Sequence, residues 1–156
     1  MQSDSLLKLV RTKEERIKLS SELKLLLDGL YKSGKNSFDS LIKSQIDKQT
    51  ADILTNNFKK EVDREEYLKQ SIKLLEDMDE IEVTISYKPS ENTINSISEW
   101  ISNNLKGNYA IDFKCDPEII AGLTLTINGK FLDLSYKAKF EEYFNENITN
   151  LKKNLV

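Results

Sequence analysis

Residues 123–134 read LTLTINGKFLDL, and this short stretch carries the clearest structural signal in the chain. Apolar and polar residues alternate on both sides of Asn128-Gly129, which is the pattern of half-buried β-strands. An Asn-Gly pair between two such runs favours a two-residue type I′ hairpin, because both central residues need a positive φ. The predicted register places Leu132 opposite Leu125, and Leu134 opposite the first leucine of the stretch, on one face of a sheet.

The residues before the hairpin predict a strand, a helix and a second strand. Residues 81–87 and 109–115 alternate apolar and polar side chains, and residues 91–105 carry isoleucine and leucine at helical spacing. Two strands joined by a helix favour a parallel pair with a right-handed crossover. After Ser135 a last helix is expected, with an apolar side formed by Phe140, Phe144, Ile148 and Leu151. Residues 80–156 therefore predict the order β-α-β-β-β-α and a mixed sheet.

Residues 1–79 have the spacing of short amphipathic helices. A short first helix is expected around residues 6–10, and Thr12 with Glu15 forms a capping-box pattern that opens a longer one. The longer helix is expected to have an apolar side and to end at Gly34 and Asn36; that side comprises Leu19, Leu23, Leu26, Leu27 and Leu30. The N-caps expected for the later helices are Ser37, Thr50 and Asp63. The predicted fold class is α+β, with a small helical bundle over residues 1–79 and an α/β domain over residues 80–156.

The composition argues against catalysis and against metal or cofactor binding. The chain has no histidine and one cysteine, so it lacks imidazole bases, imidazole metal ligands and paired cysteine ligands. It also has no glycine-rich phosphate loop between a strand and a helix. We therefore expect no catalytic residue, no metal and no cofactor. A small enzyme that uses carboxylates with lysine or tyrosine is a distant alternative.

Three other features have simple structural interpretations. Cys115 lies on the apolar phase of its strand, so it is expected to be a small buried side chain. Trp100 follows the apolar face of its helix and is expected at the edge of the core. An acidic cluster matches no calcium-binding loop and is interpreted as a solvated junction between the halves; it comprises Glu76, Asp77, Asp79 and Glu80.

Charge and hydropathy narrow the possible partners. The chain has 23 basic and 26 acidic residues and a net charge of −3, with no basic stripe, so a nucleic-acid partner is not expected. No apolar run approaches the length of a membrane-spanning helix, and the first residues do not have the pattern of a signal peptide. These features predict a soluble intracellular protein.

Residues 109–140 contain an ordered set of short motifs. The set comprises a strand, Asp-Pro, two apolar residues, a glycine, an alternating strand, a tight turn and a strand that ends in Asp-x-Ser before a helix. The matching residues are Asp116, Pro117, Ile119, Ile120, Gly122, Asn128, Gly129, Asp133 and Ser135. This set resembles the C-terminal part of the delta subunit of F-type ATP synthases, the family of the oligomycin-sensitivity-conferring protein. The resemblance covers about residues 80–145, although Ala121 and Leu134 replace family glycines.

The motif residues themselves favour structural roles over chemistry. A glycine before a strand, here Gly122, permits close packing. Asp116 before Pro117 favours a turn, and Asp133 and Ser135 can cap the final helix.

The resemblance implies a non-catalytic subunit of a peripheral stalk. By resemblance, the helical half would bind N-terminal segments of the alpha subunits at the catalytic head, and the C-terminal half would bind the ends of b-type stalk helices. The protein would lie at the cytoplasmic face of a bacterial plasma membrane, with no small-molecule substrate. The helical half is shorter than the family's N-terminal domain.

Apolar residues near the two ends of the chain are candidate anchors for these partners. The candidates are Leu6, Leu9 and Val10 for the head, and Leu151, Leu155 and Val156 for the stalk. A second resemblance, to the E subunit of A- or V-type rotary ATPases, is kept as an alternative. That subunit would begin with one long helix, whereas several helix-ending signals interrupt residues 1–79.

Overall fold

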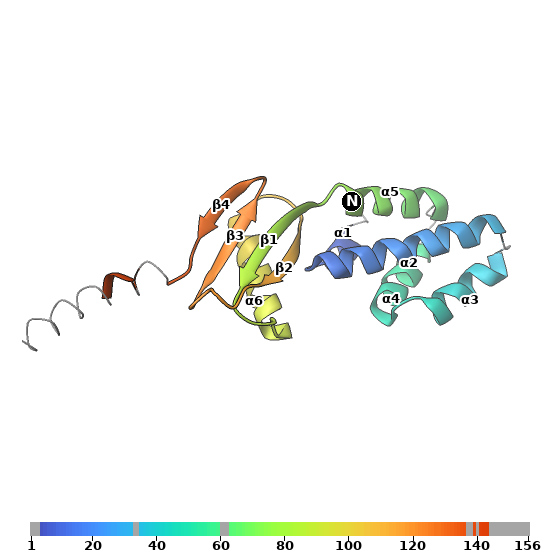
Figure 1. The fold of residues 1–156 in the computed structure, drawn as a ribbon. Helices are drawn as coiled ribbons and strands as arrows, with labels where there is room; N and C mark the ends of the chain where they lie inside the picture. The colour runs from blue at the N-terminus through green and yellow to red at the C-terminus, as the bar shows by residue number, and fades with distance from the viewer. Residues whose placement is uncertain (1–3, 33–34, 60–62, 137–138, 140, 144–156) are drawn as a thin grey trace, which may run out of the picture.

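The protein consists of a helical half and a sheet half that lie end to end (Figure 1). The computed structural model describes residues 4–32, 35–59, 63–136, 139 and 141–143. The helical half comprises α1 (Asp4–Leu7), α2 (Lys13–Lys32), α3 (Lys35–Gln45), α4 (Lys48–Phe58) and α5 (Arg64–Glu76). The sheet half comprises β1 (Asp79–Ile85), α6 (Glu91–Asn104), β2 (Tyr109–Cys115), β3 (Leu123–Ile127) and β4 (Lys130–Asp133).

Two of the predicted helix starts are confirmed by their hydrogen bonds. The backbone N–H of Glu15 donates to Thr12 Oγ1 at 3.2 Å, and the N–H of Thr12 donates to the Glu15 carboxylate at 3.1 Å, which completes a capping box. Asp63 caps α5, because its carboxylate accepts from the N–H groups of Glu65 and Glu66. α2 ends at Lys32, before the predicted stop residues, and Asn36 lies inside α3.

The other two predicted N-caps are wrong. α4 begins after Asp47, whose carboxylate accepts from the N–H of Gln49, so Thr50 lies inside the helix and is buried. Asp47, three residues earlier in the chain, supplies the cap, and the helix starts there. α3 begins at Lys35, so Ser37 also lies inside its helix.

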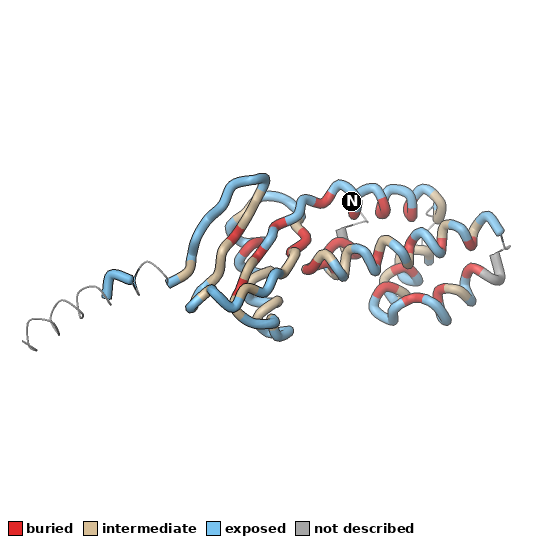
Figure 2. Tube along the Cα trace, in the orientation of Figure 1, coloured by how far each residue is buried: buried red, intermediate tan, exposed pale blue. Residues whose placement is uncertain are grey.

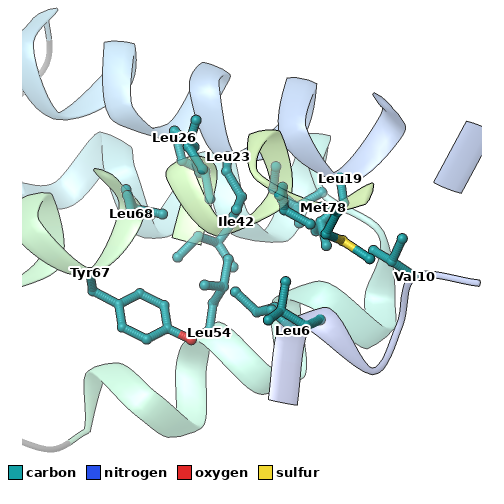
Figure 3. Packing of buried hydrophobic residues seen from close by; sticks show 14 of the residues in the cluster. Leu6, Val10, Leu19, Leu23, Leu26, Ile42, Leu54, Tyr67, Leu68 and Met78 are labelled. Atoms are coloured by element: carbon teal, nitrogen blue, oxygen red, sulfur yellow. The ribbon is translucent and has the colours of Figure 1, made fainter. Parts of the chain in front are cut away.

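The helical half has its own apolar core (Figure 3). Leu19, Leu23 and Leu26 of α2 form one side, as the helical spacing predicts. α1 folds back so that Leu6 and Val10 enter the same cluster, where Leu68 and Tyr67 of α5 and Leu54 of α4 complete it. Fully burying an aliphatic side chain contributes about 1.5–3 kcal/mol, so this cluster stabilises the helical half.

The sheet is mixed, and its strand order is β2-β1-β3-β4. β1 and β2, which α6 connects, pair in parallel, and β3 pairs antiparallel with β4, which confirms the predicted strand pair and hairpin. β3 also pairs antiparallel with β1, which the sequence did not predict. Asn128 and Gly129 have φ values of 49° and 74°, as the type I′ hairpin requires. Leu132 lies opposite Leu125 as predicted. β1 ends at Ile85, where its pairing with β3 stops, so Tyr87 lies outside the strand and is exposed.

One face of the sheet forms a second apolar core. The buried residues are Ile81, Val83, Ile85, Ile101, Ile111 and Leu125, and Ile101 comes from α6, which packs on this face. The edge strand β4 is different, because all four of its residues are exposed (Figure 2). The apolar face of the sheet therefore extends beyond the area that α6 covers.

Two expectations about single residues change. Cys115 is exposed and not buried, because it ends β2, which is an edge strand. The side chain of Trp100 is 47% exposed, so it is more open to solvent than a residue at the edge of the core was expected to be. The last helix predicted on Phe140, Phe144, Ile148 and Leu151 lies outside the described residues. In the described part of the chain, no helix combines the length and the apolar character needed to span a bilayer.

Candidate interaction surfaces

Apart from Asn128 and Gly129, which form the turn of the β3–β4 hairpin, the family-like motif residues lie where the chain enters and leaves the hairpin. The Asp116 carboxylate accepts from the N–H of Glu118 at 2.9 Å, which forms the predicted turn at Pro117. Asp133 accepts from the N–H of Ser135 at 2.8 Å in a second turn of this kind. The N–H of Tyr136 donates to the carbonyl of Ala121 at 2.8 Å, so the two ends of the hairpin are joined.

Gly122 lies at the closest approach between these two ends. Its φ is +89°, and a Cβ atom there would lie 2.4 Å from the carbonyl oxygen of Leu134. Of the two isoleucines in the motif, Ile119 is half-buried and Ile120 is exposed. Together the motif residues close a loop against a strand end, and the geometry offers no nucleophile or acid–base pair.

A group of apolar side chains beside this loop is exposed, and we call it the hairpin patch. Its residues are 45–54% exposed; they are Ile120, Leu132, Leu134 and Tyr136. Phe131, which lies opposite Thr126, is exposed on the other face of the hairpin. The alternation of the strand indicated that Leu132 and Leu134 share a face with Leu125, but it could not show that α6 leaves them uncovered. Exposed apolar groups that gather in one place are typical of interaction sites.

A second exposed apolar group runs along the outer side of α2, and we call it the α2 ridge. Its residues are 43–62% exposed; they are Ile17, Leu25 and Tyr31. Beside Ile17 a groove of about 320 Å³ runs between α2 and α5, lined also by Lys24 and Glu76, whose side chains form an ion pair at 2.8 Å. Helical spacing in the sequence predicts the inward leucines of α2 but not this ridge, because polar residues separate its three apolar residues on that side of the helix.

The anchors proposed for the head do not lie on the surface. Leu6 is 1% exposed and Val10 is 7% exposed, and Leu9 packs partly against the same cluster. Leu6 and Val10 are therefore not uncovered after packing, because α1 and the residues that follow it pack against the other helices, including α4 and α5. The anchors proposed for the stalk, Leu151, Leu155 and Val156, lie outside the described residues.

Polar contacts join the two halves through residues 11–16, which we call the junction segment. Arg11 binds Glu15 and reaches Glu91 at 3.1 Å, at the start of α6. Lys13 lies between Glu80 of β1 at 2.9 Å and Asp112 of β2 at 3.1 Å. Arg16 binds Glu80 as well.

The acidic cluster between the halves is therefore paired, in part, with cations from α2. Arg16 also donates to the carbonyl of Met78 at 3.1 Å. The described residues contain no group of acidic or cysteine side chains arranged to hold a metal ion. The acidic residues that the sequence placed in a solvated junction therefore have specific partners: Glu80 binds Lys13 and Arg16, and Glu76 binds Lys24.

These contacts lower the pKa values of the carboxylates in the junction. Burial alone would raise the pKa of Glu15, but hydrogen bonds from the Arg11 side chain and from the N–H groups of Arg11 and Thr12 outweigh it and lower the pKa. The hydrogen bond from Lys13, helped by the charge of Arg16, lowers the pKa of Glu80. The pKa of Asp112 is lowered because Lys13 and Lys114 together outweigh its burial.

Protonation of these carboxylates at acid pH should weaken the junction. A carboxylate with a lowered pKa in the folded state stabilises the fold above its ordinary pKa, 4.5 for Glu15, and this contribution is lost as the pH falls through the folded-state value. We expect Tm to fall as the pH drops below about 4.5, and Glu15→Gln to reduce that fall by about 2–4 °C. Thermal melts at several pH values test this, with the exposed neighbour in Glu14→Gln as the matched control. Equal pH dependence in both variants would contradict the role of Glu15.

The cavities do not suggest a reaction centre. One cavity, of about 340 Å³, lies at the junction between Lys8, Arg11, Ser98, Ile101 and Tyr109. Two further cavities, of about 270 and 320 Å³, each have a single carboxylate in their lining, Asp39 and Glu76. None of the three brings carboxylates together, so the enzyme alternative gains no support from them.

Comparison with known families gives a match that agrees with this architecture. The family model of the ATP synthase delta (OSCP) subunit matches residues 33–146, which include the later helices and the whole described sheet. A comparison with curated proteins found no match. The matched family is a structural subunit of the peripheral stalk of ATP synthase and is not a catalytic one. The chain belongs to the ATP synthase delta (OSCP) subunit family.

Proposed function

We propose that this chain links the catalytic head of an F-type ATP synthase to its b-type stalk helices and carries no catalytic step of its own. The helical half would bind N-terminal segments of the alpha subunits, and the sheet half would bind the C-terminal ends of the b-type helices. The observation that supports this best is the presence of one exposed apolar surface in each half, the α2 ridge and the hairpin patch. The protein would then be peripheral, at the cytoplasmic face of a bacterial plasma membrane.

The α2 ridge suits an amphipathic helix as its partner. Ile17 and Leu25 lie two helical turns apart on α2, and the groove next to Ile17 is open to solvent. A partner helix with apolar residues at positions i, i+3 and i+4 can fill such a groove, while Lys24 and Glu76 offer polar contacts at its side. This surface replaces the buried Leu6 and Val10 as our candidate for the head.

The hairpin patch suits the stalk for a related reason. Leu132 and Leu134 continue the apolar face of the sheet past the edge of α6, so a helix from another subunit could extend that cover. Lys130 and Asp133, at the ends of the short strand β4, are exposed. Charged residues on a short edge strand discourage pairing with another strand, which favours a helical partner over an extended one.

Two double variants test the two surfaces separately. The tagged full chain is recovered from membranes of its source organism, and the bound subunits are identified by mass spectrometry. Leu132→Asp with Leu134→Asp should reduce recovery of b-type subunits at least about tenfold and leave the alpha subunits bound. Ile17→Asp with Leu25→Asp should do the reverse. Asn92→Asp on α6 and Asn56→Asp on α4, both exposed, are the matched charge controls.

The outcomes distinguish the proposal from its alternative. Unchanged recovery of both partners by both double variants, with circular dichroism showing folded protein, would contradict the assigned surfaces. Recovery of A- or V-type subunits would support the E-subunit alternative, which would require a single long helix where this chain has α1 to α5. Recovery of neither set, from membranes that contain the synthase, would contradict the linking role.

A further inference from the structure

The covalent connection between the halves is short and single. Among the described residues, the chain passes from the helical half to the sheet half once, between Glu76 at the end of α5 and Asp79 at the start of β1. A single crossing of this kind would by itself allow the halves to bend relative to each other. The contacts of the junction segment form a second, non-covalent crossing about sixty residues earlier in the chain.

The second crossing includes the backbone. The N–H of Ile111, in β2, donates to the carbonyl of Arg11 at 3.0 Å, and Thr12 forms an isolated parallel bridge with Ile111. Residues before α2 therefore extend the edge of the sheet at the start of β2. Thr12 is buried, and Ala110, although it belongs to β2, lies fully buried in the core of the helical half.

The side chains of the junction segment reach three different elements of the sheet half. Arg11 binds Glu91 and Asn95 of α6. Lys13 binds Asp112 of β2, and Lys13 and Arg16 both bind Glu80 of β1. Any bend at residues 77–78 must separate these contacts together with the Ile111 hydrogen bond and the Ala110 packing.

We propose that the junction segment is a clasp that holds the helical half and the sheet half as one rigid body. The clasp consists of the cations Arg11, Lys13 and Arg16, their carboxylate partners on β1, β2 and α6, and the backbone bond from Ile111. An exposed ion pair is weak alone, but these pairs surround a backbone hydrogen bond and a buried alanine that all open in the same motion. The clasp fixes the orientation of the α2 ridge relative to the hairpin patch, whatever partners these surfaces bind.

Amide hydrogen exchange gives a test at the clasp itself. The clasp variant is Arg11→Gln with Lys13→Gln and Arg16→Gln. The matched control is Lys18→Gln with Lys24→Gln and Arg64→Gln, which removes the same charge from ion pairs that lie within the helical half. The Ile111 N–H should exchange at least about tenfold faster in the clasp variant than in the control. The N–H of Asp116, which bonds to Ile85 within the sheet, should be unchanged in both.

A distance measurement tests the rigid-body claim. Spin labels are placed on the exposed native Cys115 and on a cysteine introduced by Ser44→Cys in α3, and the spread of the distance between them is measured. The distribution should be narrow in the parent and in the control, and at least twice as wide in the clasp variant. A wide distribution in the parent, or an equally narrow one in the clasp variant with unchanged Ile111 exchange, would overturn the proposal.

A milder variant covers the case in which the triple variant does not fold. Glu80→Gln removes the carboxylate that Lys13 and Arg16 share, whereas Glu76→Gln removes a carboxylate paired within the helical half. Glu80→Gln should widen the distribution and speed Ile111 exchange about threefold or more relative to Glu76→Gln. No difference between these two variants would also overturn the clasp. Partner binding does not enter either measurement, so failure here is distinct from failure of the proposed function.

Discussion

Replacing Leu6 by alanine is expected to lower the free energy of unfolding by about 2–5 kcal/mol. Leu6 is 1% exposed and packs among α1, α4 and α5, so truncation removes buried apolar contacts and leaves a cavity. The effect should appear in urea denaturation of the isolated protein, without any partner. The sequence analysis gave Leu6 as a candidate surface anchor for the head, with no prediction about stability.

Leu25→Ala is the matched control for this experiment. Leu25 is also a helical leucine, but it lies on the α2 ridge and is 43% exposed. Its truncation should change stability by roughly 0.5 kcal/mol or less. If Leu6→Ala proved as mild as Leu25→Ala, α1 would not be part of the core, and the original assignment of Leu6 to the head would return.

Gly122→Ala is expected to cost at least about 2 kcal/mol of stability. Two effects add at this position, because the backbone has a φ of +89° and the new Cβ would lie 2.4 Å from the Leu134 oxygen and 2.9 Å from the Ser135 Cα. Both obstacles are backbone atoms, which cannot rotate away as a side chain can. The strand end must therefore separate from the loop, and the hydrogen bond from Tyr136 to Ala121 should weaken.

Gly129→Ala separates these two effects. Gly129 also has a positive φ, +74°, but a Cβ atom there would meet no atom within 4 Å. Its cost should be the backbone term alone, about 1–2 kcal/mol. Denaturation curves of both variants, with amide exchange at Tyr136, provide the measurement. Equal costs for the two substitutions would show that the contact between Gly122 and the strand end is not tight.

Local patterns predicted most elements of the fold correctly. The Asn128-Gly129 pair fixed the hairpin and its register because few residues accept two positive φ angles in succession. The capping residues Thr12 and Asp63 fixed two helix starts through bonds to residues within one turn. Where two cap residues compete, as Asp47 and Thr50 do, the local pattern does not choose between them.

The candidate surfaces depended on packing that no local pattern contains. Whether Leu6 is core or surface depends on where α1 lies relative to α4 and α5, and whether Leu132 is covered depends on how far α6 extends across the sheet. Cys115 has the apolar phase of its strand, but it ends an edge strand and is exposed. In each case the side chain's environment comes from an element that is distant in the sequence.

The sequence by itself therefore determined the order of helices and strands, the hairpin, and the absence of histidine chemistry, since these depend on residue type and on neighbours within a few positions. Only the tertiary structure decided which apolar residues remain exposed and which cations join the two halves. Arg11, Lys13 and Arg16 find their partners at Glu91, Asp112 and Glu80, which lie 64 or more residues away along the chain. Such pairs form because folding brings the start of α2 to the edge of the sheet, and helix and strand periodicities carry no information about that meeting.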